Sequence, residues 1–312
     1  MSNLEEGADL NALVARPLSS PLLLEPRRVK LTTRSGVTIE RALPHKELKR
    51  IGAWCFLDSY GPTSEAGAMQ VGAHPHTGLQ TVTWLFSGMV LHHDSIGSKS
   101  TIRAGELNLM TAGRGISHSE ISLDGAEPLQ GMQLWVALPE SARNQKPEFS
   151  HYQILTKFTY EGLEITLFMG ELLGRISPAK IHSPLIGAQI SLSAGTFSLP
   201  LHPDWEYGFH VVCESVIVEG TTVNKDQLFY LPPGRESVQI NAQETSTLIL
   251  IGGEPFREQF VMWWNFIGRS HEEIVEMRKE WETNPNRFPS FVDTIGVRIP
   301  APEMPNLRLT PR

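Results

Sequence analysis

The feature that most constrains this chain is a rhythm of short apolar runs, broken about every ten residues by glycine or proline. Across residues 28–140 the runs read VTIERAL, LQTVTWLFSG, MVLHHDS, LNLMTAG and LQGMQLWVAL. β-Branched and aromatic residues dominate these runs, and such residues favour strands. Even spacing of many short strands is typical of sandwiches and barrels, so the pattern predicts an all-β fold.

The same texture returns in residues 151–253, which indicates an internal duplication. There the runs read YEGLEITLFMGEL, AQISLSAGTFSLPL, GFHVVCESVIVEG, DQLFYLPPG and STLILIGG. TWLFSG at 83–88 resembles SVIVEG at 215–220, because each is a strand that ends in a glycine turn. GELNLMTAG at 105–113 resembles KDQLFYLPPG at 225–234 in a similar way. This weak self-similarity predicts two related β-barrels.

The changes in texture divide the chain into four predicted segments. An N-terminal arm covers residues 1–27 and carries little pattern. The first barrel is expected over 28–140 and the second over 141–268, connected by the polar segment ESARNQKPEF. Residues 269–312 form a C-terminal helix and tail.

The C-terminal segment is the place where the hydrophobic period becomes helical. Ser270 precedes HEEIVEMRKEWE, which has two glutamates in its first turn. Ile274, Met277 and Trp281 are spaced to share one face. This predicts a capped amphipathic helix. We expect the proline-rich end, PAPEMPNLRLTPR, to cross the surface as extended chain, and WWNF at 263–266 to serve core packing or an inter-barrel contact.

Composition argues against several classes of protein. The chain has 312 residues, 40% of them hydrophobic, and a formal net charge of -7. An acidic chain without a basic tract is not expected to bind nucleic acid directly. It has no run of about 18 apolar residues to span a membrane and no secretory signal, so we expect a soluble cytoplasmic protein. Cys55 and Cys213 are too few for a disulfide scaffold and are expected to be buried free thiols.

Two histidine-containing pairs carry the chemistry. The string GAHPHTGLQ places His74 and His76 two residues apart. The string GRGISHSE gives His118 and Glu120 the same spacing. On a strand, residues i and i+2 point to the same face, so each pair converges on one point, and a barrel could bring the pairs face to face. Pro75 has no backbone N–H to donate, so its strand should end there or lie at a sheet edge.

Three neutral imidazoles and one carboxylate make a nitrogen-rich ligand set that leaves one or two positions for water or substrate. Such a set suits Fe(II), Mn, Ni, Cu, Co or Zn better than Mg or Ca. A single histidine on a strand is more often a packed residue, but two such pairs favour a metal site. His92 and His93 face opposite ways on a strand, so at most one points inward, where Asp94 could be its hydrogen-bond partner. We interpret neither as a ligand, and the glycine turn at 113–115 as aiming the following histidine inward rather than binding an anion.

The strings HPHTGLQTVTWLFSG, LMTAGRGISHSE and GMQLWVALP resemble the pirin family of the cupin superfamily. The match is clear over residues 28–140 and looser over 150–268. It implies a bicupin, two face-to-face cupin barrels of jelly-roll type, with one metal ion in the first barrel held by His74, His76, His118 and Glu120. Iron is the usual metal in the family, although relatives carry other divalent ions. The second barrel is expected to hold no metal, because LHPDWEYGFHVV has His202 and His210 but no HxH pair.

Two positions depart from the common pirin pattern of HPHRG followed by a glutamate. Thr77 stands where many relatives have arginine, which removes a cation from the expected rim of the pocket. That puts in doubt any substrate recognition through this position. Gln80 stands in place of the glutamate. Because the resemblance takes the carboxylate ligand from Glu120, Gln80 does not threaten the metal site.

The resemblance implies more than one function. Some pirins resemble quercetin 2,3-dioxygenases, in which a flavonol chelates the metal and dioxygen opens the ring with release of carbon monoxide. Glu120 would then be a metal ligand that also accepts the substrate's proton. Other pirins are similar to protein partners of transcription factors or metabolic enzymes, so a metal-dependent regulatory role without turnover is the alternative. A third hypothesis is a metal that only braces the barrel, or a different small-molecule enzyme; in each case we expect a monomer.

Overall fold

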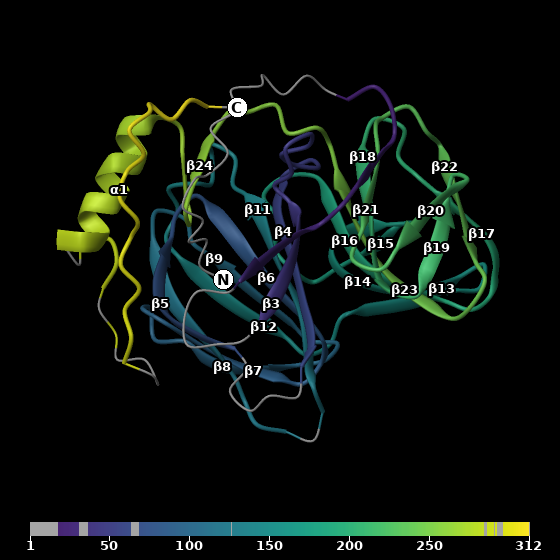
Figure 1. The fold of residues 1–312 in the computed structure, drawn as a ribbon, viewed down its shortest axis with the longest axis horizontal. Helices are drawn as coiled ribbons and strands as arrows, with labels where there is room; N and C mark the ends of the chain where they lie inside the picture. The colour runs from purple at the N-terminus through teal and green to yellow at the C-terminus, as the bar shows by residue number, and fades with distance from the viewer. Residues whose placement is uncertain are drawn as a thin grey trace.

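The computed structural model of this chain describes residues 18–30, 37–63, 69–125, 127–283, 286–289, 291 and 296–311. Two β-barrels lie next to each other, and the helix α1 lies on the flank of the first barrel that faces away from the second (Figure 1). The predicted all-β fold of two barrels is confirmed. Residues 1–17 of the predicted arm lie outside the described residues.

The first barrel consists of two antiparallel sheets. Its seven-stranded sheet has the order β12 (Glu148–Tyr152), β9 (Leu107–Thr111), β6 (Leu79–Ser87), β11 (Leu129–Ala137), β4 (Trp54–Thr63), β3 (Thr38–Leu43) and β2 (Arg27–Lys30). Its four-stranded sheet has the order β5 (Gln70–His76), β10 (Ile116–Ser122), β7 (Met89–Asp94) and β8 (Lys99–Arg103).

The second barrel repeats this arrangement. Its larger sheet has the order β1 (Leu22–Leu24), β21 (Leu228–Leu231), β18 (Glu206–Cys213), β23 (Ser246–Gly253), β16 (Leu185–Leu192), β14 (Leu163–Leu172) and β13 (Thr156–Tyr160), with β15 (Arg175–Ile176) paired to β14. Its four-stranded sheet has the order β17 (Gly195–Pro200), β22 (Ser237–Ala242), β19 (Ser215–Val218) and β20 (Thr221–Asn224).

The two strand orders match position by position, which confirms the duplication and corrects one detail of it. β9 corresponds to β21, as the similarity between 105–113 and 225–234 predicts. The other predicted pairing is one strand out of step. TWLFSG at 83–88 ends β6, whose counterpart is β18, whereas SVIVEG at 215–220 forms β19, the counterpart of β7. A strand that ends in a glycine turn recurs in both hairpins, so the motif alone could not set the alignment.

In each barrel one edge strand of the larger sheet comes from outside the segment predicted for that barrel. β1, in the N-terminal arm, pairs with β21 of the second barrel, where Leu22 lies opposite Tyr230. β12, which begins in the last two residues of the connector, pairs with β9 of the first barrel, where Phe149 lies opposite Met110. These exchanged strands tie the barrels together in addition to the packing at their seam.

The seam between the barrels is a mixed core of large apolar side chains. The Phe168 ring lies 5.0 Å from that of Trp84, stacked, and 6.4 Å from that of Trp54, edge to face. Burying aromatic side chains of this size contributes strongly to stability. The interior of the second barrel is a separate cluster that includes Leu199 and Phe209.

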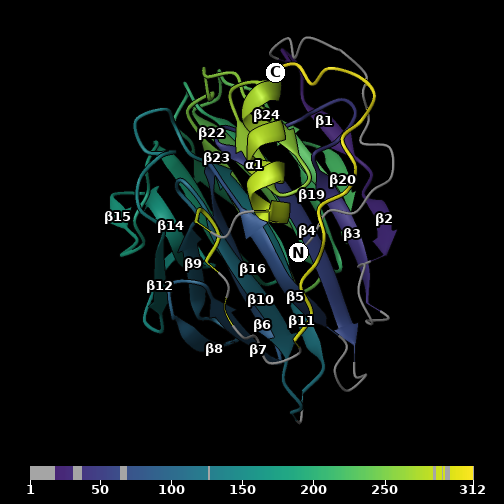
Figure 2. The same cartoon turned by 90° about the vertical axis from the view of Figure 1, so that its left-hand side faces the viewer.

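The C-terminal segment packs on the first barrel. α1 (His271–Thr283) buries Ile274, Met277 and Trp281 against the aromatic residues of the short hairpin formed by β24 (Val261–Trp263) and β25 (Phe266–Gly268). The amphipathic helix and the core-packing role of WWNF are therefore confirmed. In Figure 2 the tail runs beside α1 across the face that carries β5. Ala73 of β5 exchanges backbone hydrogen bonds with the tail, at 2.7 Å to Val297 and 2.8 Å to Ile299.

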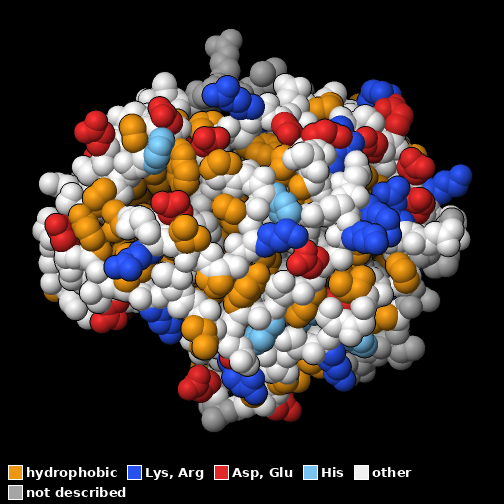
Figure 3. All heavy atoms as spheres, turned by 180° about the vertical axis from the view of Figure 1, so that it is seen from behind, with side chains coloured by type: hydrophobic (Ala, Val, Ile, Leu, Met, Phe, Trp, Pro, Cys, Tyr) orange, Lys and Arg blue, Asp and Glu red, His pale blue; other side chains and the backbone are white. Residues whose placement is uncertain are grey.

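Two sequence-based expectations about surface and thiols can be compared with this fold. Within the described residues no helix is long and apolar enough to cross a membrane. Acidic and basic side chains are mingled over the face shown in Figure 3, in keeping with a chain that lacks a basic tract. Both cysteines are free, as predicted, but only Cys55 is buried; Cys213 is half-buried, because it ends β18 at the edge of the seam.

Candidate metal centre

The predicted ligand pairs lie on two neighbouring strands of the first barrel. β5 and β10 are antiparallel partners, and His74 lies directly opposite His118. The pairs are therefore side by side on one sheet, not face to face across the barrel as the sequence analysis suggested. The register shifts between His118 and Glu120 because β5 carries an extra residue there, between Val71 and His74, whereas β10 pairs with β7 without interruption. β5 is an edge strand of its four-stranded sheet, as Pro75 predicts.

Three imidazoles converge in the barrel interior. The rings of His74 and His118 are 4.4 Å apart between centroids, and His76 lies 5.0 Å from each. One nitrogen from each ring lies within 4.8 Å of the others. The Nε2 atoms of His76 and His118 are 3.1 Å apart. Two nitrogens bound to one ion at about 2.1 Å would be separated by roughly 3.0 to 3.4 Å in octahedral or tetrahedral geometry, so this spacing fits a shared metal.

The protonation of these rings also suits metal binding. His74 donates from Nδ1 to the Gly72 carbonyl oxygen, 2.8 Å away, which leaves a lone pair on Nε2. That Nε2 is buried and has no hydrogen-bond partner among the described residues. All three rings are 0% exposed, and burial lowers the pKa of His74, His76 and His118 well below the usual range. Neutral imidazoles with inward lone pairs are what a divalent metal requires.

Glu120 lies in the same barrel interior but has different neighbours from the three clustered histidines. Its Oε1 is 3.0 Å from the Thr83 hydroxyl, which is itself 3.1 Å from the Gln133 side-chain oxygen. Its carboxylate falls within 4.8 Å of nitrogens of His92 and His118, whereas the three-histidine cluster does not include it. Burial, together with the Glu120 charge, raises the pKa of the nearby Tyr60 phenol well above its usual range. The sequence analysis missed Thr83, Gln133 and Tyr60, because residues of these types are common on strands.

The inward-facing member of the HH pair is His92. It is buried, and its Nε2 lies 3.0 Å from the Asp94 carboxylate, as the sequence analysis suggested. Its Nδ1 lies 3.3 Å from Nδ1 of His118. His93 faces the other way and contacts the Phe291 ring, 5.0 Å away. Burial raises the pKa of Asp94, but hydrogen bonds from His92 and from the Ser98 backbone outweigh it and hold that pKa below the usual value.

The turn before β10 sets the direction of His118. Gly113 has a φ of 52°, in the left-handed region that disfavours other residues. A Cβ atom there would also lie 2.2 Å from the Gln145 carbonyl oxygen. The predicted tight turn is therefore present, and it is held against the connector between the barrels.

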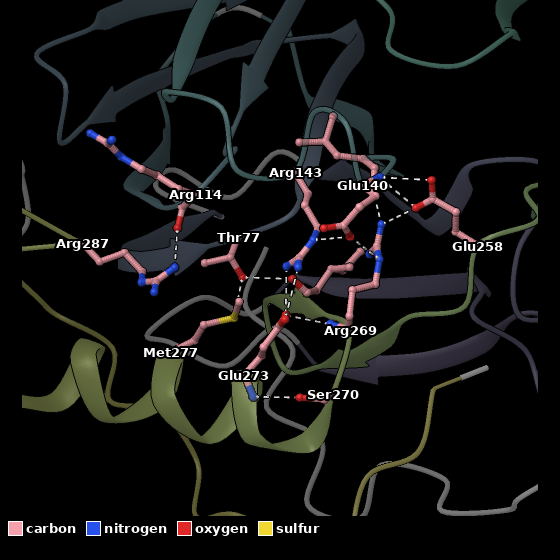
Figure 4. Close-up of polar contacts among 12 residues, drawn as sticks. Thr77, Arg114, Glu140, Arg143, Glu258, Arg269, Ser270, Glu273, Met277 and Arg287 are labelled. Atoms are coloured by element: carbon pink, nitrogen blue, oxygen red, sulfur yellow. Dashed lines mark hydrogen bonds and ion pairs between the residues drawn. The ribbon is translucent and has the colours of Figure 1, made fainter.

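Thr77 is not on a pocket rim, and that expectation is wrong. Its side chain is 1% exposed, and its hydroxyl lies 3.1 Å from the Met277 sulfur atom and 3.4 Å from the Ile267 carbonyl oxygen. Figure 4 shows Thr77 pointing at α1, beside the ion pair in which Arg143 contacts Glu273 at 2.9 Å. The Thr77 side chain is therefore covered by the C-terminal helix.

Gln80 also points away from the histidines, donating to the Thr111 hydroxyl at 2.9 Å. Neither of the two histidines singled out in the second barrel belongs to a group of possible metal ligands among the described residues. His202 is exposed and stacks on Trp205. His210 is buried at the seam and lines a cavity of about 460 Å³ together with Ser59 and Asp226. None of the four predicted ligands lines that cavity.

Comparison with known proteins places this architecture in a family. The Pirin family model matches residues 36–136, and the model of the pirin C-terminal cupin domain matches residues 188–288. The chain belongs to the pirin family. A "Pirin-like protein" of Caulobacter vibrioides is 34% identical to this pirin over 90% of the chain and 99% of its own length. A Pseudomonas aeruginosa protein named provisionally as a quercetin 2,3-dioxygenase is 39% identical over 98% of both chains.

A solved structure extends the likeness to three dimensions. The crystal structure of a quercetin 2,3-dioxygenase from Acinetobacter baumannii superposes with a TM-score of 0.89 at 38% identity. The match covers 93% of this pirin and 98% of that chain. This pirin is therefore a bicupin throughout, and its quercetin dioxygenase-like relatives imply a divalent metal.

Proposed function

We propose that this pirin is a metal-dependent dioxygenase of the quercetin 2,3-dioxygenase type. The observation that carries the proposal is the convergence of three buried, neutral imidazoles on one point in the first barrel. His74, His76 and His118 are assigned as nitrogen ligands and Glu120 as the carboxylate ligand. Fe(II) is the proposed metal, since this nitrogen-rich set accepts first-row divalent ions.

The four proposed ligands leave one or two coordination positions of the metal open for a substrate. A flavonol would chelate a metal held there through its 3-hydroxyl and 4-carbonyl groups, and that coordination would lower the pKa of the hydroxyl and polarise the ring. We assign Glu120 as the group that accepts the proton from that hydroxyl. Thr83 holds Oε1 of that carboxylate at 3.0 Å, so Oε2 is the atom assigned to receive the proton. The three histidines stay fixed by the strand backbone while the longer glutamate side chain can rotate.

The relatives support the reaction class. The Acinetobacter baumannii protein that matches this pirin over 93% of the chain bears the name quercetin 2,3-dioxygenase. A flavonol-like small molecule is therefore the proposed substrate. Cupin barrels host many unrelated activities, so the fold by itself would not support this step.

The deciding experiment couples elemental analysis with oxygen uptake on the same Fe(II)-loaded sample. We expect about one metal per chain, quercetin-dependent oxygen uptake and release of carbon monoxide. His118→Ala should lose metal and uptake together. His202→Ala, an exposed histidine of the second barrel, is the matched control and should keep both. Metal without uptake would contradict the activity and favour a regulatory role, and absence of metal after reconstitution would contradict the metal centre.

A further inference from the structure

A hydrogen-bonded series of three buried side chains begins at the proposed ligand His118 and continues through His92 to Asp94. Nδ1 of His118 lies 3.3 Å from Nδ1 of His92, and Nε2 of His92 lies 3.0 Å from Oδ2 of Asp94. His118 and Asp94 are 0% exposed and His92 is 2% exposed. Because buried polar groups must be paired, the positions of the protons along this chain are constrained.

Backbone N–H groups at the Asp94 end fix the direction of donation along this series of hydrogen bonds. Asp94 accepts hydrogen bonds at Oδ1 from the backbone N–H groups of Ile96, 3.0 Å away, and Ser98, 2.9 Å away. An ionised carboxylate accepts at both oxygens, so Nε2 of His92 is the donor to Oδ2. A ring that donates from Nε2 can accept with the lone pair on Nδ1, which in His92 is the atom 3.3 Å from Nδ1 of His118.

That lone pair fixes His118 in turn. Nδ1 of His118 must carry its proton to donate to His92, so the lone pair of His118 lies on Nε2. Nε2 is the atom that faces Nε2 of His76 at 3.1 Å, where the shared metal would lie. The orientation of the His92 ring is held from its other side, because it stacks on Phe149 with centroids 4.3 Å apart and planes inclined by 12°.

We propose that His92 and Asp94 are positioning residues that hold His118 in its metal-binding tautomer and orientation. The inference rests on the metal centre proposed above. His92 also groups with His118 and Glu120 as a set of possible ligands. Since one imidazole nitrogen of His118 faces the other two histidines and the other faces His92, His92 lies one residue outside the ligand set. Outer partners of this kind are typically worth 10–100-fold in metal affinity.

Two variants test the direction of hydrogen-bond donation from His118 through His92 to Asp94. In Asp94→Asn the two backbone N–H groups still require the side-chain oxygen, so the amide N–H would turn toward His92. Nε2 of His92 would then accept, its proton would move to Nδ1, and His118 would be driven to carry its proton on the metal-facing nitrogen. In His92→Phe the stack on Phe149 remains but the acceptor is lost. We expect at least about tenfold weaker metal binding in each.

The matched control is His93→Phe, on the same strand but facing the opposite side. Its affinity should stay within about threefold of wild type, since outer-shell losses begin near tenfold. Affinity is measured by competition of Zn(II) with a chromophoric chelator. The visible spectrum of the Co(II)-loaded protein is recorded alongside, with thermal unfolding of each metal-free variant. A positioning role weakens binding while the Co(II) spectrum keeps the wild-type ligand count, and metal-free stability does not follow the affinity loss.

Each outcome decides the matter. Wild-type Zn(II) affinity in either Asp94→Asn or His92→Phe would overturn the inference and leave the metal centre intact. A Co(II) spectrum showing one ligand fewer in His92→Phe would make His92 a ligand instead. If His92→Phe does not fold, Asp94→Asn decides alone, because it preserves the acceptor for the turn. Failure of the wild-type chain to bind Zn(II) or Co(II) would overturn both the inference and the proposed metal centre.

Discussion

The two barrels have the same strand order but opposite interiors. On β10 of the first barrel, His118 and Glu120 are buried two residues apart. On β22, its counterpart in the second barrel, Val238 and Ile240 have the same spacing and are fully buried. One scaffold therefore carries a polar interior in one copy and an apolar one in the other. Topology supplies the positions, and the side chains placed on them decide whether a site exists.

The difference has an energetic consequence. Apolar side chains stabilise the second barrel directly, by about 25 cal/mol for each Å² removed from water. Polar side chains in the first barrel destabilise it unless each is paired or bound to a metal. We therefore expect the first barrel to depend on its hydrogen bonds, ion pairs and metal, and the second to depend on packing alone.

The largest expected effect separates the two interiors at corresponding strands. His118→Ala should reduce metal content from about one ion per chain to almost none, because it removes a nitrogen ligand. Val238→Ala should leave metal content unchanged but lower the free energy of unfolding by about 2 kcal/mol, through lost burial and a cavity. Elemental analysis and urea unfolding of both variants test the pair. Metal loss in Val238→Ala would show that the barrels are not independent in this respect.

The buried ion pair of the first barrel should give the next largest effect. Arg41 and Asp58 are 1% and 0% exposed and are joined by hydrogen bonds of 2.7 and 2.9 Å, with the guanidinium 4.6 Å above the Phe56 ring. Asp58→Ala would remove the carboxylate that pairs with this buried cation, and we expect a loss of about 3–5 kcal/mol in the free energy of unfolding. The double variant Arg41→Met/Asp58→Leu should recover most of that loss. A single-variant loss below about 1 kcal/mol would contradict the polar-interior argument.

The third prediction concerns acid, and it uses the buried histidine of the second barrel. Burial lowers the pKa of His210 from 6.5 to about 3. Below pH 6.5 the unfolded chain binds a proton that the native state does not, so stability is lost as the pH falls, at about 1.4 kcal/mol per pH unit. Metal-free His210→Phe should therefore lose about 2 kcal/mol less than wild type between pH 7.5 and 5.0.

Urea unfolding at the two pH values checks this prediction. His202→Phe, at an exposed position of the same barrel, is the control and should follow wild type. An unchanged acid response in His210→Phe would mean that the imidazole at the seam finds a proton-accepting partner in solution.

Local patterns predicted much of this molecule. Alternation and turn residues were enough for the strands, and Ser270 with its glutamates was enough for the cap of α1. The i, i+2 spacing correctly placed His74 beside His76 and His118 near Glu120 in a buried interior, because side-chain direction on a strand follows from local geometry.

The features that the sequence analysis missed or misjudged depend on pairing between segments that are distant in the sequence. Nothing local to Leu22–Leu24 shows that it pairs with β21 rather than with the barrel that follows it. The adjacency of β5 and β10, and the partnership of Thr83 with Glu120, require the register of the whole sheet. Thr77 was misjudged for the same reason, since the helix that covers it is 200 residues away along the chain.

The smallest expected effect sharpens the comparison at the helix, which covers only the first barrel. The Ser270 hydroxyl accepts a hydrogen bond from the Glu273 backbone N–H at 3.2 Å, and the Glu273 carboxylate accepts one from the Arg269 backbone N–H at 2.8 Å. This reciprocal cap should be worth about 1 kcal/mol, so Ser270→Ala should lower the free energy of unfolding of the metal-free protein by that amount, whereas Ser270→Thr should retain most of it. An equal loss in both variants would attribute the effect to packing. No loss in Ser270→Ala would mean that α1 frays independently of the barrel, so that the first barrel, like the second, is stable without a covering helix.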